Sequence, residues 1–258
     1  MIKTLTPAGM TNDAFAAAIA VRPTQIMTSN GKLRKDGISN VTMPAYRGAY
    51  VSAGQLKEVI TCPQAGQCKG YCYASSGTYG FSNSMIKHGR NLNFLMNDAF
   101  GFADQLTQEV IKSSKRPNFR AIRWNDSGDV FSEGYWGVMK VVMKANPGIR
   151  FYAYSKRISF WKAKQASGEV PANMTVVFSF GGTEDHLIDT EKDRHAMVFP
   201  SRTALRAAGY SDGTNTDRLA SNPRYNKIGL VIHGNWLALP KLRRMSAKIN
   251  AARKQQVA

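Results

Sequence analysis

The chain has 258 residues, which is long enough to bury a hydrophobic core in one large domain or two small ones. Its residues are 43% hydrophobic and 20% charged, a composition that excludes an intrinsically disordered chain. The 35 Lys and Arg residues outnumber the 17 Asp and Glu residues, so the formal net charge is +18.

The sequence predicts a cytoplasmic protein without a membrane segment. No stretch approaches the ~20 uninterrupted apolar residues of a membrane span. The short apolar run at residues 14–21 lacks the basic start and the cleavage site of a signal peptide. Reducing conditions keep cysteines as thiols, and the odd number of cysteines, three, also argues against a disulfide framework.

The positive charge makes nucleic acid a plausible partner, because phosphates that are neutralised on binding release their counterions. Basic residues concentrate at 32–35, in a stretch rich in turn residues that predicts a loop, and at 241–254. Both segments are equally compatible with a solvated surface. The nucleic-acid candidates are Lys32, Arg34, Lys35, Arg202, Lys241, Arg243, Arg244 and Lys248.

We expect a single domain in three parts: an N-terminal extension at residues 1–54, a βα core at 55–235 and a basic C-terminal helix at 240–258. Segments rich in β-branched and aromatic residues predict strands at 55–61, 118–124, 149–155, 174–180, 196–200 and 228–233. The spacing of apolar residues predicts helices at 98–112, 132–144, 158–165 and 184–192.

This alternation of strands and helices predicts the α/β class. Right-handed βαβ units give a mainly parallel sheet, either open or closed into a partial (β/α) barrel. Ligands of such sheets bind at the carboxyl ends of the strands. Polar residues follow the predicted strands at 61–74, 125–129, 155–157, 181–184 and 201–202, so we expect one site that combines several of these segments.

The cysteine loop, residues 61–74, carries Cys62, Cys68 and Cys72 with the spacing C-x5-C-x3-C. Thiolates are soft ligands suited to iron–sulfur clusters or zinc, and a glycine-containing loop allows three of them to converge. A [4Fe–4S] cluster held by three thiolates has one iron open to another ligand. The sequence therefore predicts a [4Fe–4S] cluster with three Cys ligands.

Two other interpretations stay open. A structural zinc site needs a fourth ligand, and none of the histidines, His88, His186, His195 and His233, has finger-like spacing to the cysteines. The cysteines would otherwise be ordinary core residues, although their Pro, Gly, Lys and Gln neighbours are not typical of a core.

Four blocks of sequence carry a family resemblance: the cysteine loop with its CYA ending, RWNDSGD, FSEGYW and NPGIRFYAYSK. In this order they resemble the gene-product-eighty-eight-like family of phage and mobile-element proteins, over residues 61–156. The resemblance implies the cytosol of a host cell as the location.

The cysteine loop and strand-end residues of that family are similar to those of radical S-adenosylmethionine (SAM) enzymes, which hold a [4Fe–4S] cluster at the mouth of a partial barrel. This similarity implies SAM as a second ligand, although those enzymes have the spacing C-x3-C-x2-C. The segment Gly181-Gly182-Thr183-Glu184 is similar to the GGE element that holds the SAM amino group, and it is equally typical of a simple turn.

Polar residues after two predicted strands are candidates for ligand binding. Acids and amides at a strand end suit ribose hydroxyls, an amino group or a cation. Alternatively, Ser127 or Asp129 caps the following helix, and Lys156 is an ordinary surface lysine. The ligand-binding candidates are Asn125, Asp126, Ser127, Asp129, Tyr154, Ser155 and Lys156.

Two hypotheses about function follow. The first is a radical-SAM-like iron–sulfur protein with a redox or SAM-dependent activity on nucleic acid or a nucleotide. The second is a non-catalytic iron–sulfur or zinc protein that binds nucleic acid or a host protein, its metal centre serving as a structural element or a redox sensor.

Overall fold

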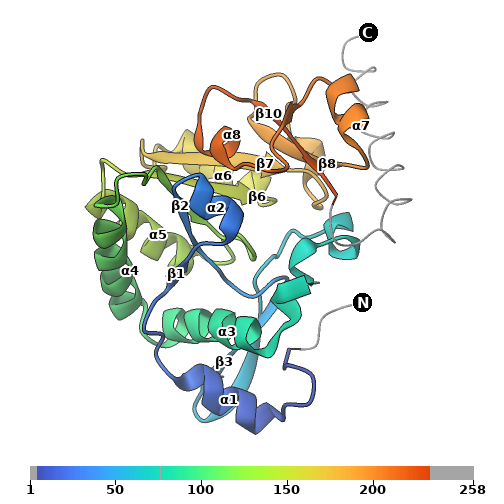
Figure 1. Ribbon diagram of the computed structural model, residues 1–258. Helices are drawn as coiled ribbons and strands as arrows, with labels where there is room; N and C mark the ends of the chain where they lie inside the picture. Colours follow the sequence, from blue (N-terminus) through green and yellow to red (C-terminus); the bar gives the residue numbers. More distant parts are fainter. Residues whose placement is uncertain (1–4, 76, 233–258) are drawn as a thin grey trace.

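The computed structural model describes residues 5–75 and 77–232, and an eight-stranded sheet runs through the upper part of the molecule in Figure 1. The order of its strands is β1-β2-β5-β6-β7-β8-β10-β9. The strands are β1 (Met27–Thr28), β2 (Ile38–Val41), β5 (Ala121–Trp124), β6 (Arg150–Ser155), β7 (Met174–Ser179), β8 (His195–Phe199), β9 (Ser211–Asp212) and β10 (Lys227–Val231). All pairs are parallel except β1 with β2, and the sheet is open.

The parallel strands from β2 to β8 stand in the sheet in their order along the chain. Each connection therefore moves one position in the same direction across the sheet, and the carboxyl ends of the strands share one edge. This is the edge at which α/β sheets bind ligands. The α/β class and the mainly parallel sheet are confirmed, and of the two predicted forms the sheet takes the open one.

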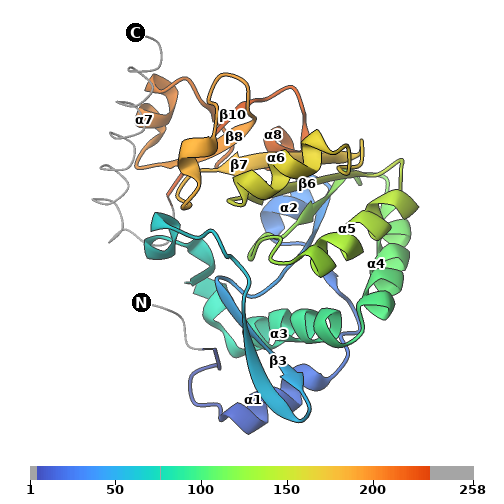
Figure 2. The same ribbon diagram turned by 180° about the vertical axis from the view of Figure 1, so that it is seen from behind.

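Helices cover both faces of the sheet (Figures 1 and 2). On one face lie α4 (Ala99–Ser114), α5 (Glu133–Ala145) and α6 (Ile158–Ala166), and Trp136 of α5 packs in one core with Trp124 and Phe151 of the sheet. On the other face lie α2 (Gly31–Lys35) and α8 (Arg218–Ser221). Their side chains Leu33 and Ala220 pack in a second core with Tyr152. The short helix α7 (Arg202–Ala207) follows β8.

Most of the predicted elements after residue 98 are present. Strands β5, β6, β7, β8 and β10 and helices α4, α5 and α6 lie within a few residues of their expected bounds. The helix expected at 184–192 is only a 3-10 turn at Asp185–Leu187. The Asp189 carboxylate accepts hydrogen bonds from the N–H groups of Glu191 and Lys192, and such local side-chain bonds compete with helix formation.

The strand predicted at 55–61 forms, but it does not belong to the parallel sheet. It is β4 (Gln55–Ile60), which pairs antiparallel with β3 (Arg47–Ser52) in a separate hairpin. The hairpin packs on α1 (Asn12–Ala20) and α3 (Ser82–Asn97) in the lower part of Figure 1. The cysteine loop therefore follows a hairpin and not the first strand of the sheet.

The first 54 residues are more than an extension, because they supply β1, β2 and α2 to the sheet layer. Residues 32–35, predicted as a loop, lie in α2. The Asn30 side chain caps this helix by accepting a hydrogen bond from the Leu33 N–H at 2.9 Å, and Leu33 is fully buried. The basic helix predicted at 240–258 lies outside the described residues.

A buried carboxylate fastens α2 and α8 to the sheet. Asp217 forms ion pairs with the Lys32 Nζ at 2.6 Å and with the Arg123 Nη1 at 2.8 Å. It also accepts a hydrogen bond from the Tyr152 hydroxyl at 2.7 Å. Burial disfavours the charged form of Asp217, but Arg123 and Lys32 outweigh burial and hold its pKa below the ordinary value of 3.8.

We predict that Asp217→Asn lowers the free energy of unfolding by about 3 to 5 kcal/mol at neutral pH, because it leaves buried Arg123 without its anionic partner. Because the folded pKa is depressed, the stabilisation by Asp217 is complete above pH 3.8 and is lost as the pH falls through the folded pKa. Denaturant unfolding should therefore show a gap between wild type and variant that narrows below pH 3.8.

The matched control is Asp104→Asn on the exposed side of α4, which should leave stability unchanged. Equal stability of Asp217→Asn and wild type at neutral pH would contradict this account of the α2 and α8 attachment.

Candidate metal centre and ligand site at the strand ends

The cysteine loop is fixed to the turn that follows β7. The Gly181 carbonyl accepts hydrogen bonds from the Gly66 N–H at 3.2 Å and from the Cys68 N–H at 2.9 Å. The Gln64 carbonyl in turn accepts one from the Thr183 N–H at 3.0 Å. These are backbone contacts that hold the loop at the edge of the sheet, and the Thr183 hydroxyl adds a hydrogen bond to the Gln64 side chain.

Glycines on both sides allow this close approach. A Cβ on Gly66 would lie 2.7 Å from the carbonyl carbon and oxygen of Gly182, far inside normal contact distance. Gly181 has a φ of +102°, which favours glycine. The Asp185 carboxylate accepts the N–H groups of Gly181 and Gly182, each at 2.8 Å, and so fixes the turn. In the predicted segment 181–184, it is therefore the glycines that contact the cysteine loop and hold it in place.

Glu184, the acidic residue of that segment, points elsewhere. Its carboxylate accepts hydrogen bonds from the N–H and the hydroxyl of Ser159 on α6, at 2.9 and 2.7 Å. It therefore joins α6 to the turn.

The three thiols lie within electrostatic range of one another. Burial and then the Asp129 carboxylate raise the pKa of Cys62 to about 12; Cys72 and Cys68 add to this rise, while the Tyr46 N–H, 3.4 Å from the Cys62 Sγ, opposes it. No disulfide joins cysteines among the described residues. A set of anionic thiolates at this position would therefore need a cation to compensate its charge.

The donor set of the loop fits a soft metal centre, since it offers three thiols on one short segment. In the described part of the chain, no group of three or more His, Cys, Asp or Glu side chains is gathered as a metal site. Three thiols that share one metal centre would therefore have to draw closer together, and the 3-10 turns at Gln67–Gly70 and Tyr73–Ser75 are the segments that would have to adjust.

The zinc interpretation needs a histidine, and His195 is committed elsewhere. Its ring is buried, with Nδ1 2.8 Å from the Asp193 carbonyl and Nε2 2.9 Å from the Tyr210 hydroxyl. His88 is buried on α3 and packs near the Tyr79 ring.

Asp129 joins three parts of the site. Its buried carboxylate accepts hydrogen bonds from the Val130 N–H (2.7 Å), the Ser155 hydroxyl (2.7 Å) and the Lys156 N–H (2.8 Å). Its own N–H donates to the Thr61 carbonyl at 2.7 Å. Burial raises the pKa of Asp129, and the three hydrogen bonds to its carboxylate oppose that rise. Asp129 thus ties the ends of β5 and β6 to the start of the cysteine loop.

The alternative role of Asp129 or Ser127 as the cap of α5 is wrong. Ser132 caps this helix, because its side chain accepts a hydrogen bond from the Tyr135 N–H at 3.1 Å. The buried Ser127 hydroxyl donates to the Met43 carbonyl and so ties the turn after β5 to the segment after β2.

Asn125 and Asp126 face different surroundings. Asn125 has a φ of +54°, and its side-chain oxygen accepts a hydrogen bond from the buried Tyr135 hydroxyl at 2.8 Å. Asp126 faces the region of the cysteine loop, and its Oδ2 accepts a hydrogen bond from the Tyr79 hydroxyl at 2.7 Å. Its Oδ1 is buried and has no hydrogen-bond partner among the described residues.

The candidates at the end of β6 join neighbouring strands. The Lys156 Nζ donates to the Ser179 hydroxyl at 2.7 Å, across the ends of β6 and β7. The Tyr154 ring lies 5.0 Å from the guanidinium carbon of Arg123 on β5. Ser155 is buried against Asp129. The structure therefore brings together the strand-end candidates and the cysteine loop.

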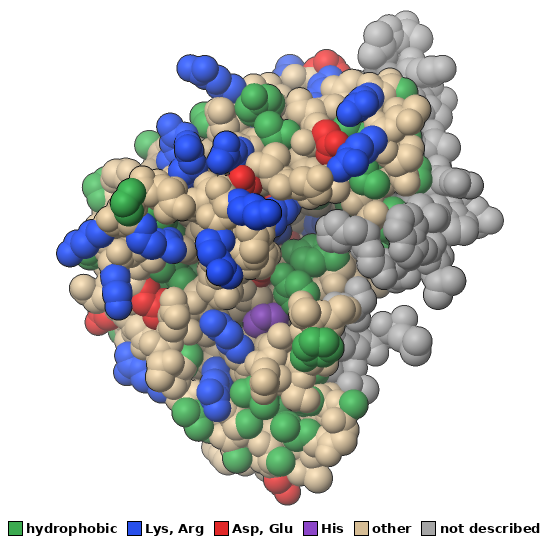
Figure 3. All heavy atoms as spheres, viewed as in Figure 1, with side chains coloured by type: hydrophobic (Ala, Val, Ile, Leu, Met, Phe, Trp, Pro, Cys, Tyr) green, Lys and Arg blue, Asp and Glu red, His purple; other side chains and the backbone are tan. Residues whose placement is uncertain are grey.

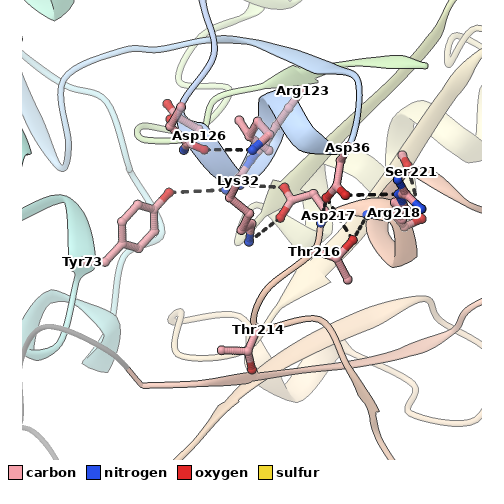
Figure 4. A network of polar contacts seen from close by, with 12 residues as sticks. Lys32, Asp36, Tyr73, Arg123, Asp126, Thr214, Thr216, Asp217, Arg218 and Ser221 are labelled. Carbon is pink, nitrogen blue, oxygen red and sulfur yellow. Dashed lines mark hydrogen bonds and ion pairs between the residues drawn. The ribbon is translucent and has the colours of Figure 1, made fainter. Parts of the chain in front are cut away.

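A chain of contacts that the sequence did not predict links the cysteine loop to the sheet (Figure 4). Tyr73, next to Cys72 in the loop, accepts a hydrogen bond from the Arg123 Nη2 at 3.3 Å, and Arg123 pairs in turn with Asp217. A signal was present, because Arg123 is a charged residue inside a predicted strand and opens the RWNDSGD block. Tyr73 belongs to the CYA ending of the cysteine loop, whereas nothing comparable marks Asp217.

The basic candidates occupy separate places. Arg34 and Lys35 are exposed on α2, whereas Lys32 pairs with Asp217. Arg202, the first residue of α7, pairs with Asp212 of β9 at 2.9 Å. Lys and Arg side chains visibly outnumber Asp and Glu on the face that Figure 3 shows. The remaining candidates, Lys241, Arg243, Arg244 and Lys248, lie outside the described residues.

Fold and site together define an open α/β protein with a thiol-rich loop at the carboxyl edge of its sheet. The family model described as gene product 88 matches residues 24–253, and the chain belongs to this family. The predicted family is thus confirmed over a longer stretch than residues 61–156.

Comparison with curated proteins and with solved structures gives no significant match. The similarity to radical SAM enzymes gains no support from the comparisons and stays a prediction. In the part of the chain that the structure describes, no helix has the length and apolar character to cross a membrane.

We predict that Gly66→Ala detaches the cysteine loop from the turn after β7, because its Cβ would clash with the Gly182 backbone. The reaction of Cys68 with a thiol reagent should become faster, since its N–H loses the Gly181 carbonyl. The matched control is Gly80→Ala, whose Cβ would meet no atom within 4 Å. Equal thiol reactivity of the two variants would contradict the importance of this contact.

Proposed function

We propose that the protein binds one [4Fe–4S] cluster through Cys62, Cys68 and Cys72. A small ligand then binds beside the cluster at the ends of β5, β6 and β7. The observation that carries this proposal is the docking of the cysteine loop on Gly181, because it keeps three thiols at the ligand-binding edge of a parallel sheet. The bound cluster would supply electron transfer and one open iron.

The chain's own residues have separate tasks in this proposal. Asp129 holds the start of the cysteine loop against the ends of β5 and β6. Lys156 places a positive charge at the ends of β6 and β7, where its Nζ donates to the Ser179 hydroxyl, and this charge offsets that of an anionic cluster or ligand. Asp126 offers a carboxylate oxygen to the ligand.

The finer form of the proposal is a redox or SAM-dependent enzyme that acts on nucleic acid or a nucleotide. It is supported by the sequential order of the parallel strands, which (β/α) barrels also have, and by the net charge of +18. A second candidate is a non-catalytic cluster or zinc protein that binds nucleic acid. The exposed Arg34 and Lys35 on α2 favour a nucleic-acid contact in either case.

We predict that protein purified without oxygen is brown and contains iron and sulfide. Each of Cys62→Ser, Cys68→Ser and Cys72→Ser should lose most of its iron, because a three-thiolate cluster has no spare ligand on the loop. The control Thr78→Ala, at an exposed position shortly after the cysteine loop, should keep the iron content of wild type. A colourless wild type that contains zinc, or cysteine variants that retain iron, would contradict the cluster.

The two candidate functions differ in a second measurement on the same material. Electron paramagnetic resonance of the reduced cluster, recorded with and without SAM, reports on the open iron. A change of the signal on adding SAM is expected for the SAM-dependent enzyme. An unchanged signal, together with salt-dependent binding of nucleic acid, would favour the non-catalytic protein.

A further inference from the structure

Arg123 has one guanidinium edge that is not paired with an anion. Its Nη1 is held by Asp217 at 2.8 Å, its Nη2 makes only a 3.3 Å contact to the Tyr73 hydroxyl, and its Nε has no hydrogen-bond partner among the described residues. Nε and Nη2 form the edge that grips an oxyanion through two parallel hydrogen bonds. Because the side chain is only 13% exposed, water satisfies this edge poorly, whereas a bound oxyanion would satisfy it.

Whereas this edge of Arg123 needs an acceptor, Asp126 needs a hydrogen-bond donor. The residue is 7% exposed, and its Oδ1 lacks a hydrogen-bond donor within the described part of the chain, whereas Tyr79 satisfies its Oδ2. A buried carboxylate oxygen needs a hydroxyl or an N–H. Arg123 and Asp126 influence each other electrostatically, so both requirements belong to one place. A ligand that meets both carries an oxyanion and, close to it, a hydrogen-bond donor.

Aromatic rings adjoin this pair of unsatisfied groups. Tyr73 and Tyr79 of the cysteine-loop region have ring centroids 5.5 Å apart in an edge-to-face arrangement, and Tyr73 is 36% exposed. The turquoise segment that carries both rings lies near the middle of Figure 1, where Figure 3, in the same view, shows hydrophobic side chains with Lys and Arg side chains nearby. Flat aromatic rings at the mouth of a polar site suit the stacking of a nucleobase.

We infer that this place is a binding site for a phosphorylated nucleoside. The Arg123 edge holds the phosphate, Asp126 accepts a hydrogen bond from a ribose hydroxyl, and the base lies against Tyr73. Lys32, Arg34 and Lys35 on α2 raise the local concentration of phosphates. The unit comes either from a free nucleotide or from the end of a nucleic-acid strand. The inference rests on the proposed function in that it names the ligand class of the same site.

The direct test is titration calorimetry of the full chain with adenosine monophosphate (AMP). Adenosine lacks the oxyanion and 2′,3′-dideoxy-AMP lacks the ribose hydroxyls, so each should bind about tenfold more weakly or worse. A short 5′-phosphorylated oligoribonucleotide distinguishes the two sources, because tighter binding than AMP identifies a strand end and weaker binding identifies a free nucleotide. Methionine, which carries a carboxylate and an amino group without a base, should not bind.

Two variants test whether AMP binds at Asp126 and Arg123. Asp126→Asn keeps an oxygen for Tyr79 but presents an amide donor where the ribose hydroxyl needs an acceptor, so AMP should bind at least about tenfold more weakly. Arg123→Lys keeps a positive charge for Asp217 but lacks the two-donor edge, with the same expected loss. Asp104→Asn on exposed α4 is the matched control and should bind as wild type does. Thermal unfolding of each variant identifies any loss of binding that is due to misfolding.

Three results would overturn the inference: no AMP binding by wild type, unchanged AMP binding by a folded Asp126→Asn protein, or methionine binding more tightly than AMP. Iron content measured on the same samples separates this inference from the cluster proposal. Iron without AMP binding contradicts the nucleotide site alone, and AMP binding without iron contradicts the cluster alone.

Discussion

Two N–H groups of the cysteine loop meet the single carbonyl of Gly181, and the geometry of the site depends on this contact. The loop has only 3-10 turns of its own, and it is reached from β2 through the separate β3–β4 hairpin. Local structure therefore does not hold it at the edge of the sheet. Glycine at positions 66 and 181 makes the contact possible, and Asp185 holds the turn in place. A side chain at either glycine would push the part of the loop around Cys68 away from the turn after β7, whereas Cys62 is also held through Thr61 and Asp129.

Although the protein is basic and has few acidic residues, several of its aspartates are buried. Asp36, Asp126, Asp129 and Asp217 are each at most 7% exposed, although carboxylates are rarely so buried unless they are paired or hydrogen-bonded. Asp129 and Asp217 pull neighbouring elements together through charge-assisted hydrogen bonds. Asp126 alone of the four keeps one oxygen without a donor among the described residues, and for this reason we propose it as the ligand contact. The other three carboxylates are bonded within the protein and serve to hold the fold.

The strands from β5 onward could be predicted from the sequence because they include short runs of β-branched and aromatic residues, such as β6, β7 and β8, which are typical of strands buried on both faces. Of the helices and strands before residue 98, β4 alone was predicted. Helix α3 carries buried Asn91 and Asn93, whose side chains bind the backbone at Thr42 and Val51, so its buried face does not look apolar. Helix α2 has five residues and is too short to show a period.

The same limits apply to the site. The cysteine loop and Asp129 could be recognised because they directly follow predicted strands or form a spaced motif. The contacts among Arg123, Tyr73 and Asp217 form only when segments far apart in the chain meet. Asp217, for example, lies in a polar loop, and nothing in the sequence links this loop to β5 or α2. Tertiary ion pairs of this kind have no local sequence pattern. The binding edge is therefore predictable from strand ends, whereas its buried charge network is not.

We propose that the docked cysteine loop holds one iron–sulfur cluster. Native mass spectrometry of the full chain, purified and sprayed without oxygen, weighs the bound centre itself. We expect a mass increase that equals one [4Fe–4S] cluster and that disappears in Cys68→Ser. The mass of the bare chain, or an increase that equals one zinc ion, would refute the cluster.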